Sequence, residues 1–569
     1  MTLVDVVRAL ARACPKDVET SGELDRALGF LGSDLAAETV VRAGYVAFLP
    51  TAVALIAVGL LAVPSWPLVV AAALAGGAGV THAVHRTPVV LATLERTRTL
   101  GSVTGLVGRV VLRMRIEPTV ERAATFAART GDGALAESLG DHARRTAGTP
   151  ETGLDGFATE WGEWFPSLSR AVSLVESAAD APAEERDRTL DRSMSAVLDG
   201  VGDEMADFAG NVRGPVTGVY AFGVLLPLAL VGVLPAARAA GVRVSLLGFV
   251  AFYDVLLPLA LCWTTIWLFA RRPVAFPPPR VGGDHPDIPD GDWLPMLAGV
   301  AGGAAGWWVS SAVVASWASP VAAVGLGFGC ALVVRYRPVK AVRDRVRDVE
   351  SALDDALYLV GQRVVEGEAV ETALDHAGDE LTGATGDVLS ETASLQRRLR
   401  VGVREAFLGD CGSLAALPSP RTKGAAALLS LAATEGRPAG EAIVATADQL
   451  TELRQAERDA RRELASVTDT LGNTAAVFAP LVGGSTVALA ERLVRTGEAT
   501  RLAGASIAVP DLGAAIGVYV LLLTAILTTL TTGLSRGLDR ALIGYRVGVA
   551  LLLATPTFLA GFVAAGLFL

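Results

Sequence analysis

The chain has very little lysine. Its cations are almost all arginine, and the lysines are Lys16, Lys340 and Lys423. None of them follows a glycine, so the Gly-Lys-Ser/Thr sequence that cradles phosphates in P-loop proteins is missing. ATP hydrolysis by that route is therefore excluded.

Cysteine and histidine are also scarce, and neither forms a ligand pattern. The four cysteines have no CxxC spacing, and the five histidines are scattered. No disulfide framework or metal site is indicated. We expect no cofactor and no catalytic residue, and the protein is not expected to be an enzyme.

Charge is sparse as well. Asp, Glu, Lys and Arg make up 19% of the 569 residues, whereas about a quarter is usual in soluble proteins. Hydrophobic residues make up 51%, and the mean hydropathy is +0.46. The deficit of charge is local, because runs such as 221–234 and 547–569 contain none. The formal net charge of −10, with few lysines and much alanine, valine and glycine, is typical of salt-loving organisms.

The uncharged runs are long enough to cross a membrane. A spanning helix needs roughly 20 apolar residues, because it crosses about 30 Å at 1.5 Å per residue. The sequence predicts an all-α membrane protein with about nine transmembrane helices. The expected spans are 43–63, 66–84, 215–234, 245–270, 294–315, 318–335, 471–490, 512–533 and 548–569.

Basic residues near the span ends predict the orientation, since cytoplasmic loops collect arginine and lysine. The residues expected inside are Arg42, Arg86, Arg96, Arg98, Arg213, Arg271, Arg272, Arg335, Arg337, Lys340, Arg536, Arg540 and Arg546. Those expected outside are Arg238, Arg243, Arg492, Arg495 and Arg501. The N-terminus is then cytoplasmic and the C-terminus outside, in a multi-pass protein of the cell membrane. The first 42 residues have no apolar run, so no cleaved signal peptide is expected.

The spans divide the chain into two similar halves. The expected segments are an N-terminal cytoplasmic helical segment (1–42), a membrane hairpin (43–84), a first cytoplasmic helical domain (86–214), a hairpin (215–270), a proline-rich linker (271–293), a hairpin (294–335), a second cytoplasmic helical domain (336–470) and three C-terminal membrane helices (471–569). Both water-facing segments are rich in helix formers, with apolar residues three and four apart. Each half has the order hairpin, helical domain, hairpin, which predicts parallel repeats with both helical domains on the cytoplasmic face.

Sequence echoes support the duplication. Val107-Gly108-Arg109 and the run 119–123 resemble Val360-Gly361-Gln362 and the run 369–373. The spans that follow share Pro227-Leu228 and Pro480-Leu481. Proline inside these spans, and at Pro258, predicts kinks that are candidate hinges.

Two enzyme-like motifs have better structural explanations. Gly533-Leu534-Ser535-Arg536-Gly537 matches GxSxG, but a membrane helix precedes it and no histidine follows it. Tyr253-Asp254 and Gly200-Val201-Gly202-Asp203 resemble the two halves of an intramembrane aspartyl protease in reversed order, and Asp203 lies in a water-facing stretch. Neither motif predicts catalysis.

Asp254 is an ionisable group in the middle of a predicted span. Such groups are costly in a bilayer and usually face the bundle interior. Two interpretations are open. Asp254 is either a structural hydrogen-bonding group or a switchable contact in a moving bundle.

Two groups of arginines are candidate partner-binding residues. They are Arg109, Arg113 and Arg115 in the first domain and Arg454, Arg458, Arg461 and Arg462 in the second. Helical spacing places Arg454, Arg458 and Arg461 on one face. This face is either a solvated surface that pairs with acidic neighbours or lipid head groups, or a docking strip for an acidic partner.

The chain resembles the type II secretion system F family, in its archaeal branch of type IV pilus and archaellum platform proteins. The resemblance rests on the duplicated domain between hairpins and on the run 220–236, YAFGVLLPLALVGVLPA, followed by Phe252-Tyr253-Asp254 and the run 272–277. It also rests on the run 433–440, which is similar to the family's Gly-Glu-x-Ser/Thr-Gly turn, with Thr434 in place of glycine and Glu435 as its acid.

The resemblance implies a non-enzymatic platform whose helical domains engage a hexameric secretion ATPase, including through Glu435. Its membrane helices would hold pilin subunits for insertion into a filament. The expected partners are that ATPase, pilin subunits, the lipid bilayer and a second copy of the chain in a dimer, with no nucleic acid. The alternatives are a secondary transporter with parallel repeats and a membrane scaffold or sensor.

Overall fold

The computed structural model describes residues 3–13, 18–62, 66–131, 133–146, 148–149, 152–239, 245–272, 281–282, 285–289, 291, 293–435, 437–495, 508–537 and 539–568, some of them by their backbone alone. All regular structure in these ranges is helical, with no strand. The all-α fold is therefore confirmed. Most of the expected linker 271–293 lies outside the described residues, but His285 donates from Nε2 to the Ala416 carbonyl at 2.8 Å, which ties the linker to the second domain.

Eight helical segments among the described residues are long and apolar enough to cross a membrane. They lie in α3 (Ala37–Ala62), α10–η1–α11 (Ala183–Gly218, Val219–Leu225, Leu226–Ala239), α12–η2–α13 (Leu246–Val250, Ala251–Leu256, Leu257–Ala270), α14 (Trp293–Val313), η3–α15 (Ser316–Ala318, Ser319–Glu350), α21–η4–α22 (Arg437–Asn473, Thr474–Phe478, Ala479–Arg495), α23 (Val509–Arg536) and α24 (Arg540–Phe568). The ninth expected span, 66–84, falls on α4 (Trp66–Leu100), where several side chains lie outside the described residues. The chain is a multi-pass membrane protein.

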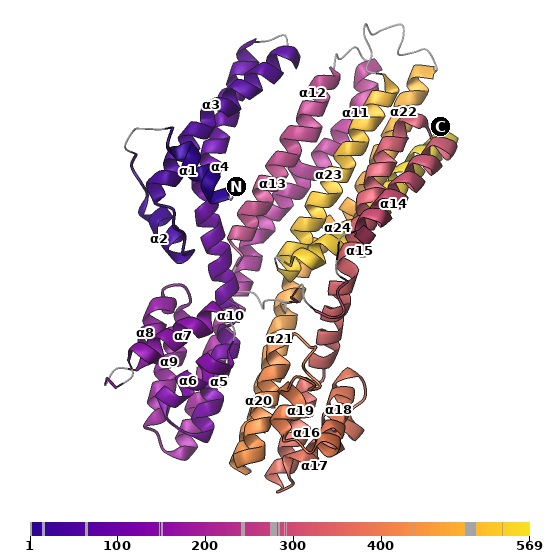
Figure 1. The fold of residues 1–569 in the computed structure, drawn as a ribbon. Coiled ribbons are helices and arrows are strands. Elements are labelled where there is room, and N and C mark those ends of the chain that lie inside the picture. The colour runs from indigo at the N-terminus through magenta and orange to yellow at the C-terminus, as the bar shows by residue number, and fades with distance from the viewer. Residues whose placement is uncertain are drawn as a thin grey trace.

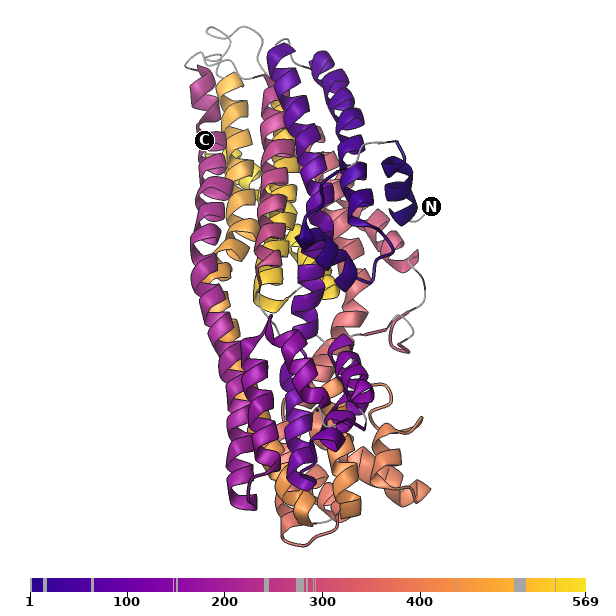
Figure 2. The same ribbon diagram turned by 90° about the vertical axis from the view of Figure 1, so that its left-hand side faces the viewer.

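The two helical domains lie side by side at one end of the bundle, the lower end in Figure 1, and the view in Figure 2 agrees. The first contains α5 (Val103–Ile116), α6 (Val120–Thr130), α7 (Ala134–Arg145), α8 (Gly153–Gly162), α9 (Pro166–Ala179) and the first part of α10. The second contains the end of α15, α16 (Leu353–Val365), α17 (Val370–Glu380), α18 (Ala384–Leu399), α19 (Val403–Leu408), α20 (Pro420–Glu435) and most of α21. The expected domains were 86–214 and 336–470; residues 86–100 belong to α4, which is one helix from Trp66 to Leu100.

The helices of the two domains correspond one to one. Helices α5, α6 and α7 each begin 250 residues before α16, α17 and α18 (353 less 103, for example). The turn before the third helix also repeats, with Gly133 at φ +88 and Gly383 at φ +86, a conformation that favours glycine. This register pairs Val120 with Val370, as the sequence echo predicts. It pairs Val110, not Val107, with Val360, so that part of the predicted alignment is shifted by three residues.

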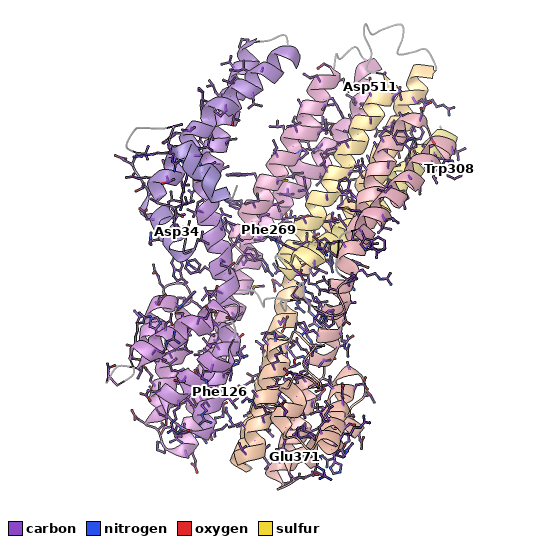
Figure 3. The ribbon with its side chains drawn as sticks, viewed as in Figure 1. Asp34, Phe126, Phe269, Trp308, Glu371 and Asp511 are labelled. Atoms are coloured by element: carbon purple, nitrogen blue, oxygen red, sulfur yellow. The ribbon has the colours of Figure 1, made fainter. Side chains whose placement is uncertain are left out.

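The two domains share an apolar contact. Leu112 of α5 belongs to the buried core of the second domain, and Ile116 and Phe126 pack against that core. Phe126 lies between the domains in Figure 3. Leu453 and Leu464 of α21 belong in turn to the core that begins in the first domain. Helices α10 and α21 also contact each other, so the domains are joined along their length.

A smaller N-terminal unit packs on the first hairpin. Helix α1 (Leu3–Ala11) contacts α3, and α2 (Gly22–Phe30) contacts α4. Leu24 and Leu28 of α2 share a small buried cluster with Val40 and Val41. The segment expected at 1–42 is thus helical and rests against the membrane hairpin.

Small residues allow the spans to approach closely, as is common between membrane helices. Gly484 of α22 lies directly against the backbone of Phe558 in α24, and Gly561 of α24 lies against the backbone of Leu481. A methyl group at Gly484 would overlap the Phe558 carbonyl oxygen and lie 2.8 Å from the backbone nitrogen of Phe562. Because these are backbone atoms, only a movement of the whole helix would relieve the overlap.

We expect the variant Gly484→Ala to lose about 1–3 kcal/mol of stability, since overpacking forces backbone shifts. Gly232→Ala in α11 is the matched control, because nothing lies within 4 Å of the position that its methyl group would take and alanine favours helix. Thermal unfolding of the detergent-solubilised protein measures both. Equal melting temperatures for the two variants would contradict the close contact between α22 and α24.

Candidate functional site

Two long helices connect the helical domains to the membrane bundle. Helix α10 runs from the first domain through η1 into α11, and α21 runs from the second domain through η4 into α22. In Figure 1 both pass from the lower lobes into the bundle without a turn. A single buried cluster includes Leu190 of the first domain, Leu471 of α21 and Val231 in the membrane. Each domain is therefore joined to a span by one continuous run of helix.

Each of these helices has a π-helical segment at the membrane, and a third lies in the span between α12 and α13. The π segments are η1, η2 and η4, and each ends two residues before a proline, at Pro227, Pro258 and Pro480. A proline ring clashes with the carbonyl four residues earlier and removes one hydrogen bond. That carbonyl lies inside the π segment in all three cases. The wider π turn makes room for the proline ring next to the carbonyl. The three prolines expected to kink the spans therefore each follow a wide turn.

Neighbouring spans supply hydroxyl groups to carbonyls at two of these places. The Tyr253 hydroxyl donates to the Pro227 carbonyl at 3.1 Å. The Thr524 hydroxyl of α23 donates to the Ala475 carbonyl of η4 at 2.8 Å. Both contacts are buried, and in a bilayer such carbonyls have no water to bind. These bonds hold each irregular segment against an adjacent span.

Asp254 lies in η2 beside a group of aromatic rings. The ring of Tyr253 stacks on Phe249, with centroids 4.4 Å apart, and meets Tyr519 edge-on at 5.2 Å. Tyr253 and Asp254 both act electrostatically on Tyr519. The Asp254 Oδ1 atom and the Tyr519 hydroxyl are buried and have no hydrogen-bond partner among the described residues. The hydrogen bond that the structural interpretation of Asp254 requires is thus not seen at Oδ1.

The arginines of the first domain make contacts within the chain. Arg113 pairs with Glu117 at 2.6 Å, and Arg115 pairs with Asp191 of α10. Arg109 donates to the Gly105 carbonyl at 3.1 Å, and its guanidinium lies beside Gly424 of the second domain. The three side chains therefore do not form one open surface. Their binding of a partner stays a prediction.

Of the four candidate arginines of the second domain, Arg454 is partly buried, and Arg458, Arg461 and Arg462 are exposed. Arg454 pairs with the buried Asp354 of α16 and donates to the Ser351 carbonyl. Arg461 pairs with Glu457, which also pairs with Arg421 of α20 at 3.3 Å.

Arg458 is exposed, and Arg462 is exposed beside Asp459 at 3.3 Å. The expected strip is therefore interrupted, with Arg454 turned inward. The side chains of residues 435–439, including Glu435, lie outside the described residues, while the backbone of 433–435 ends α20 and that of 437–440 begins α21.

The polar residues of the two enzyme-like motifs lie within helices. Ser535 lies inside α23 and donates to the Thr531 carbonyl at 2.8 Å. Asp203 lies on α10, away from the Tyr253-Asp254 pair in the sequence and on a different helix. Among the described residues no three His, Cys, Asp or Glu side chains group to hold a metal ion.

Sequence reasoning missed Tyr519 and Thr524, because both lie in the uncharged run of α23. A hydroxyl group inside an apolar span is the sequence feature that could have identified both residues. It also missed the buried pair between Arg343 of α15 and Asp539. Asp539 accepts from the backbone of Ala541 and Leu542 at 2.9 and 3.0 Å, and so caps α24.

The candidate functional features are the connecting helices, the three π segments and the half-buried Asp254 with its buried Oδ1 atom. In comparisons with known proteins, no family model, no curated protein and no solved structure matches this chain.

Proposed function

We propose that the chain is a non-enzymatic platform protein of a type IV pilus-like assembly machine, as its resemblance to the type II secretion system F family implies. It couples a cytoplasmic hexameric ATPase to the insertion of pilin subunits into a filament. The observation that carries this proposal is the pair of matched helical domains at one end of the bundle, each continuous with a span.

The physical argument is mechanical. An ATPase outside the bilayer needs a rigid group to hold, and α10 and α21 give each domain a direct connection to the bundle. The π segments at η1 and η4 lie where that connection enters the membrane-spanning part, and π turns interrupt the regular α-helical ladder. Rotation or bending of a domain is then converted into movement of α11 or α22.

Orientation and assembly belong to the same proposal. Both domains and the N-terminus face the cytoplasm, the C-terminus lies outside, and the protein works as a homodimer in the cell membrane of a salt-loving archaeon. The excess of arginine near the span ends at the domain side supports this orientation.

Capture of the ATPase is the direct test. We expect the detergent-solubilised protein to retain a purified hexameric secretion ATPase, and the double variant Arg458→Glu with Arg462→Glu to retain at least tenfold less. Both side chains are exposed, so charge reversal leaves the fold intact. The matched control is Arg192→Glu on α10, an exposed arginine of the first domain.

Two results would contradict the platform. One is the absence of capture by the wild-type protein. The other is labelling of single cysteines at Thr125 or Glu371 from outside intact cells, which would place the domains away from the ATPase. In cells, deletion is expected to remove surface filaments and leave solute uptake unchanged.

The second candidate is a secondary transporter, which Asp254 favours. Transporters carry ionisable groups and interrupted helices near the middle of the bilayer, and Asp254 lies in a π segment with a buried oxygen that has no partner among the described residues. Loss of uptake of a particular solute on deletion, with filaments intact, would select this function.

A further inference from the structure

Arginines from five elements gather where the membrane spans meet the second domain. Arg536 at the end of α23 has Arg347, Arg461 and Arg546 as electrostatic neighbours, and Arg461 also acts on Arg272. We name this group the arginine rim: Arg272, Arg347, Arg461, Arg536 and Arg546.

The acidic residues described near the arginine rim are too few to balance it. Glu457 lies near Arg536 but is shared by ion pairs to Arg461 and Arg421. Arg347 shares Asp344 with Lys340, and Arg421 pairs also with Glu350. Asp469 acts on Arg546. The buried pair of Arg343 with Asp539 lies next to Arg347 and Arg536 and adds one charge of each sign. With this pair, eight described cations face five described carboxylates, which leaves positive charge to be met by an anion.

We infer from the ends of the spans that the arginine rim lies at the level of the lipid head groups. Helix α13 ends at Ala270 and α23 at Arg536, and α24 begins at Arg540. The Arg271 guanidinium lies over the Trp267 ring at 3.9 Å, and the Lys340 ammonium lies over the Tyr545 ring at 5.4 Å. Tryptophan and tyrosine with neighbouring cations mark the membrane–water interface.

Arg272 is fixed in place within this group. Its Nε donates to the Leu534 carbonyl at 3.0 Å. Its guanidinium lies beside Gly537, whose φ of +88 and missing side chain leave room for it. Burial, and then the charge of Arg461, lower the pKa of Arg272 to about 10. A cation held among other cations in this way is stabilised by a bound anion.

We propose that the arginine rim binds the phosphate head group of an anionic membrane lipid. Guanidinium groups suit phosphate because they donate two parallel hydrogen bonds. Basic pockets between spans on the cytoplasmic side bind anionic lipid head groups. Ile266 and Trp267 of α13 are exposed and provide an apolar surface for the acyl chains. The lipid would tie the ends of α13, α23 and α24 to the second domain, whatever the protein's function.

The test is thermal unfolding of the full chain in neutral detergent with added phosphatidylglycerol or phosphatidylcholine. We expect phosphatidylglycerol to raise the melting temperature and phosphatidylcholine to leave it unchanged, because only a ligand of the folded state stabilises it. In the double variant Arg461→Gln with Arg536→Gln, the phosphatidylglycerol concentration that gives half of the rise in melting temperature should increase at least tenfold. Arg461→Lys with Arg536→Lys keeps the charge and retains most of the shift.

Arg462→Gln is the matched control, because Arg462 is the next residue on α21 but pairs with Asp459 and is 79% exposed. It should bind phosphatidylglycerol like the wild type. Equal shifts with both lipids, or an unchanged half-shift concentration in the glutamine variant, would overturn the proposal. If inorganic phosphate alone raised the melting temperature by the same amount, the site would bind a free anion, and the lipid proposal would be overturned.

Discussion

Replacing Arg454 with glutamate is expected to destabilise the second helical domain strongly. Arg454 of α21 pairs with Asp354 of α16, whose side chain is 11% exposed. The Thr451 hydroxyl donates to the other oxygen of Asp354 at 3.2 Å, and Arg454 also donates to the Ser351 carbonyl. These contacts join the long helix α21 to the break between α15 and α16.

The expected loss is about 3 kcal/mol or more, because removing one partner of a buried pair leaves the other charge uncompensated. A glutamate adds repulsion to Asp354. Since whole domains are stable by only about 5–15 kcal/mol, this change removes a large share. Hydrogen exchange in α16 and limited proteolysis of the detergent-solubilised protein measure it.

Arg462→Glu is the control for this prediction. Its pair with Asp459 is exposed on both sides, and exposed pairs contribute about 0–1 kcal/mol. If Arg454→Glu left the exchange of α16 as slow as Arg462→Glu does, the buried pair would not hold the domain together. For the same reason, Arg454 is left out of the charge-reversal variant that tests capture of the ATPase. A variant that reversed the charges of Arg454, Arg458 and Arg461 together could lose capture through unfolding of the domain and not through loss of the binding surface.

The spans and the repeat were predictable because they depend on composition and order along the chain. Uncharged runs have the length that the bilayer demands, and the echo at Val120 and Val370 lies in the register that the helices show. The shifted echo at Val107 failed because a glycine is a poor marker of register. Gly108 has open space around it, while Gly361 lies against Ile443 and Val444.

The sequence singled out the three prolines that follow irregular turns, but it did not give the physical reason why other prolines in the spans do not. Pro227, Pro258 and Pro480 follow π segments, whereas Pro50 in α3 and Pro556 in α24 lie within α-helix. The difference depends partly on neighbours. Hydroxyl groups from Tyr253 and Thr524 reach the Pro227 and Ala475 carbonyls from other helices, and no local sequence pattern reports that.

The sequence also could not show which arginines of the second domain are paired inside it, because this too depends on contacts with other helices. Helical spacing correctly relates Arg454, Arg458 and Arg461 to one another, but it does not show what lies opposite. Asp354 is 100 residues from Arg454 along the chain, and only the packing of α16 on α21 brings them together.

Replacing Asp254 with leucine is expected to make the protein more stable. Its Oδ1 atom is buried without a hydrogen-bond partner among the described residues, and an unsatisfied buried polar group costs about 1–3 kcal/mol. Leucine has the same branched shape and the same number of heavy atoms, and it suits an apolar span, so the variant should gain stability of about that size. The melting temperature of the detergent-solubilised protein measures the gain.

Asp511→Leu is the matched control, because Asp511 is exposed at the far end of α23, at the top of Figure 3. Its stability should change by less than about 0.5 kcal/mol. A gain at Asp254 means that the carboxyl is kept at a cost to stability, as functional groups often are. Under the proposed function, the same variant should lose filament assembly while still retaining the ATPase. If Asp254→Leu instead lost stability, Asp254 would be a structural hydrogen-bonding group. The interpretation as a switchable contact would then be rejected.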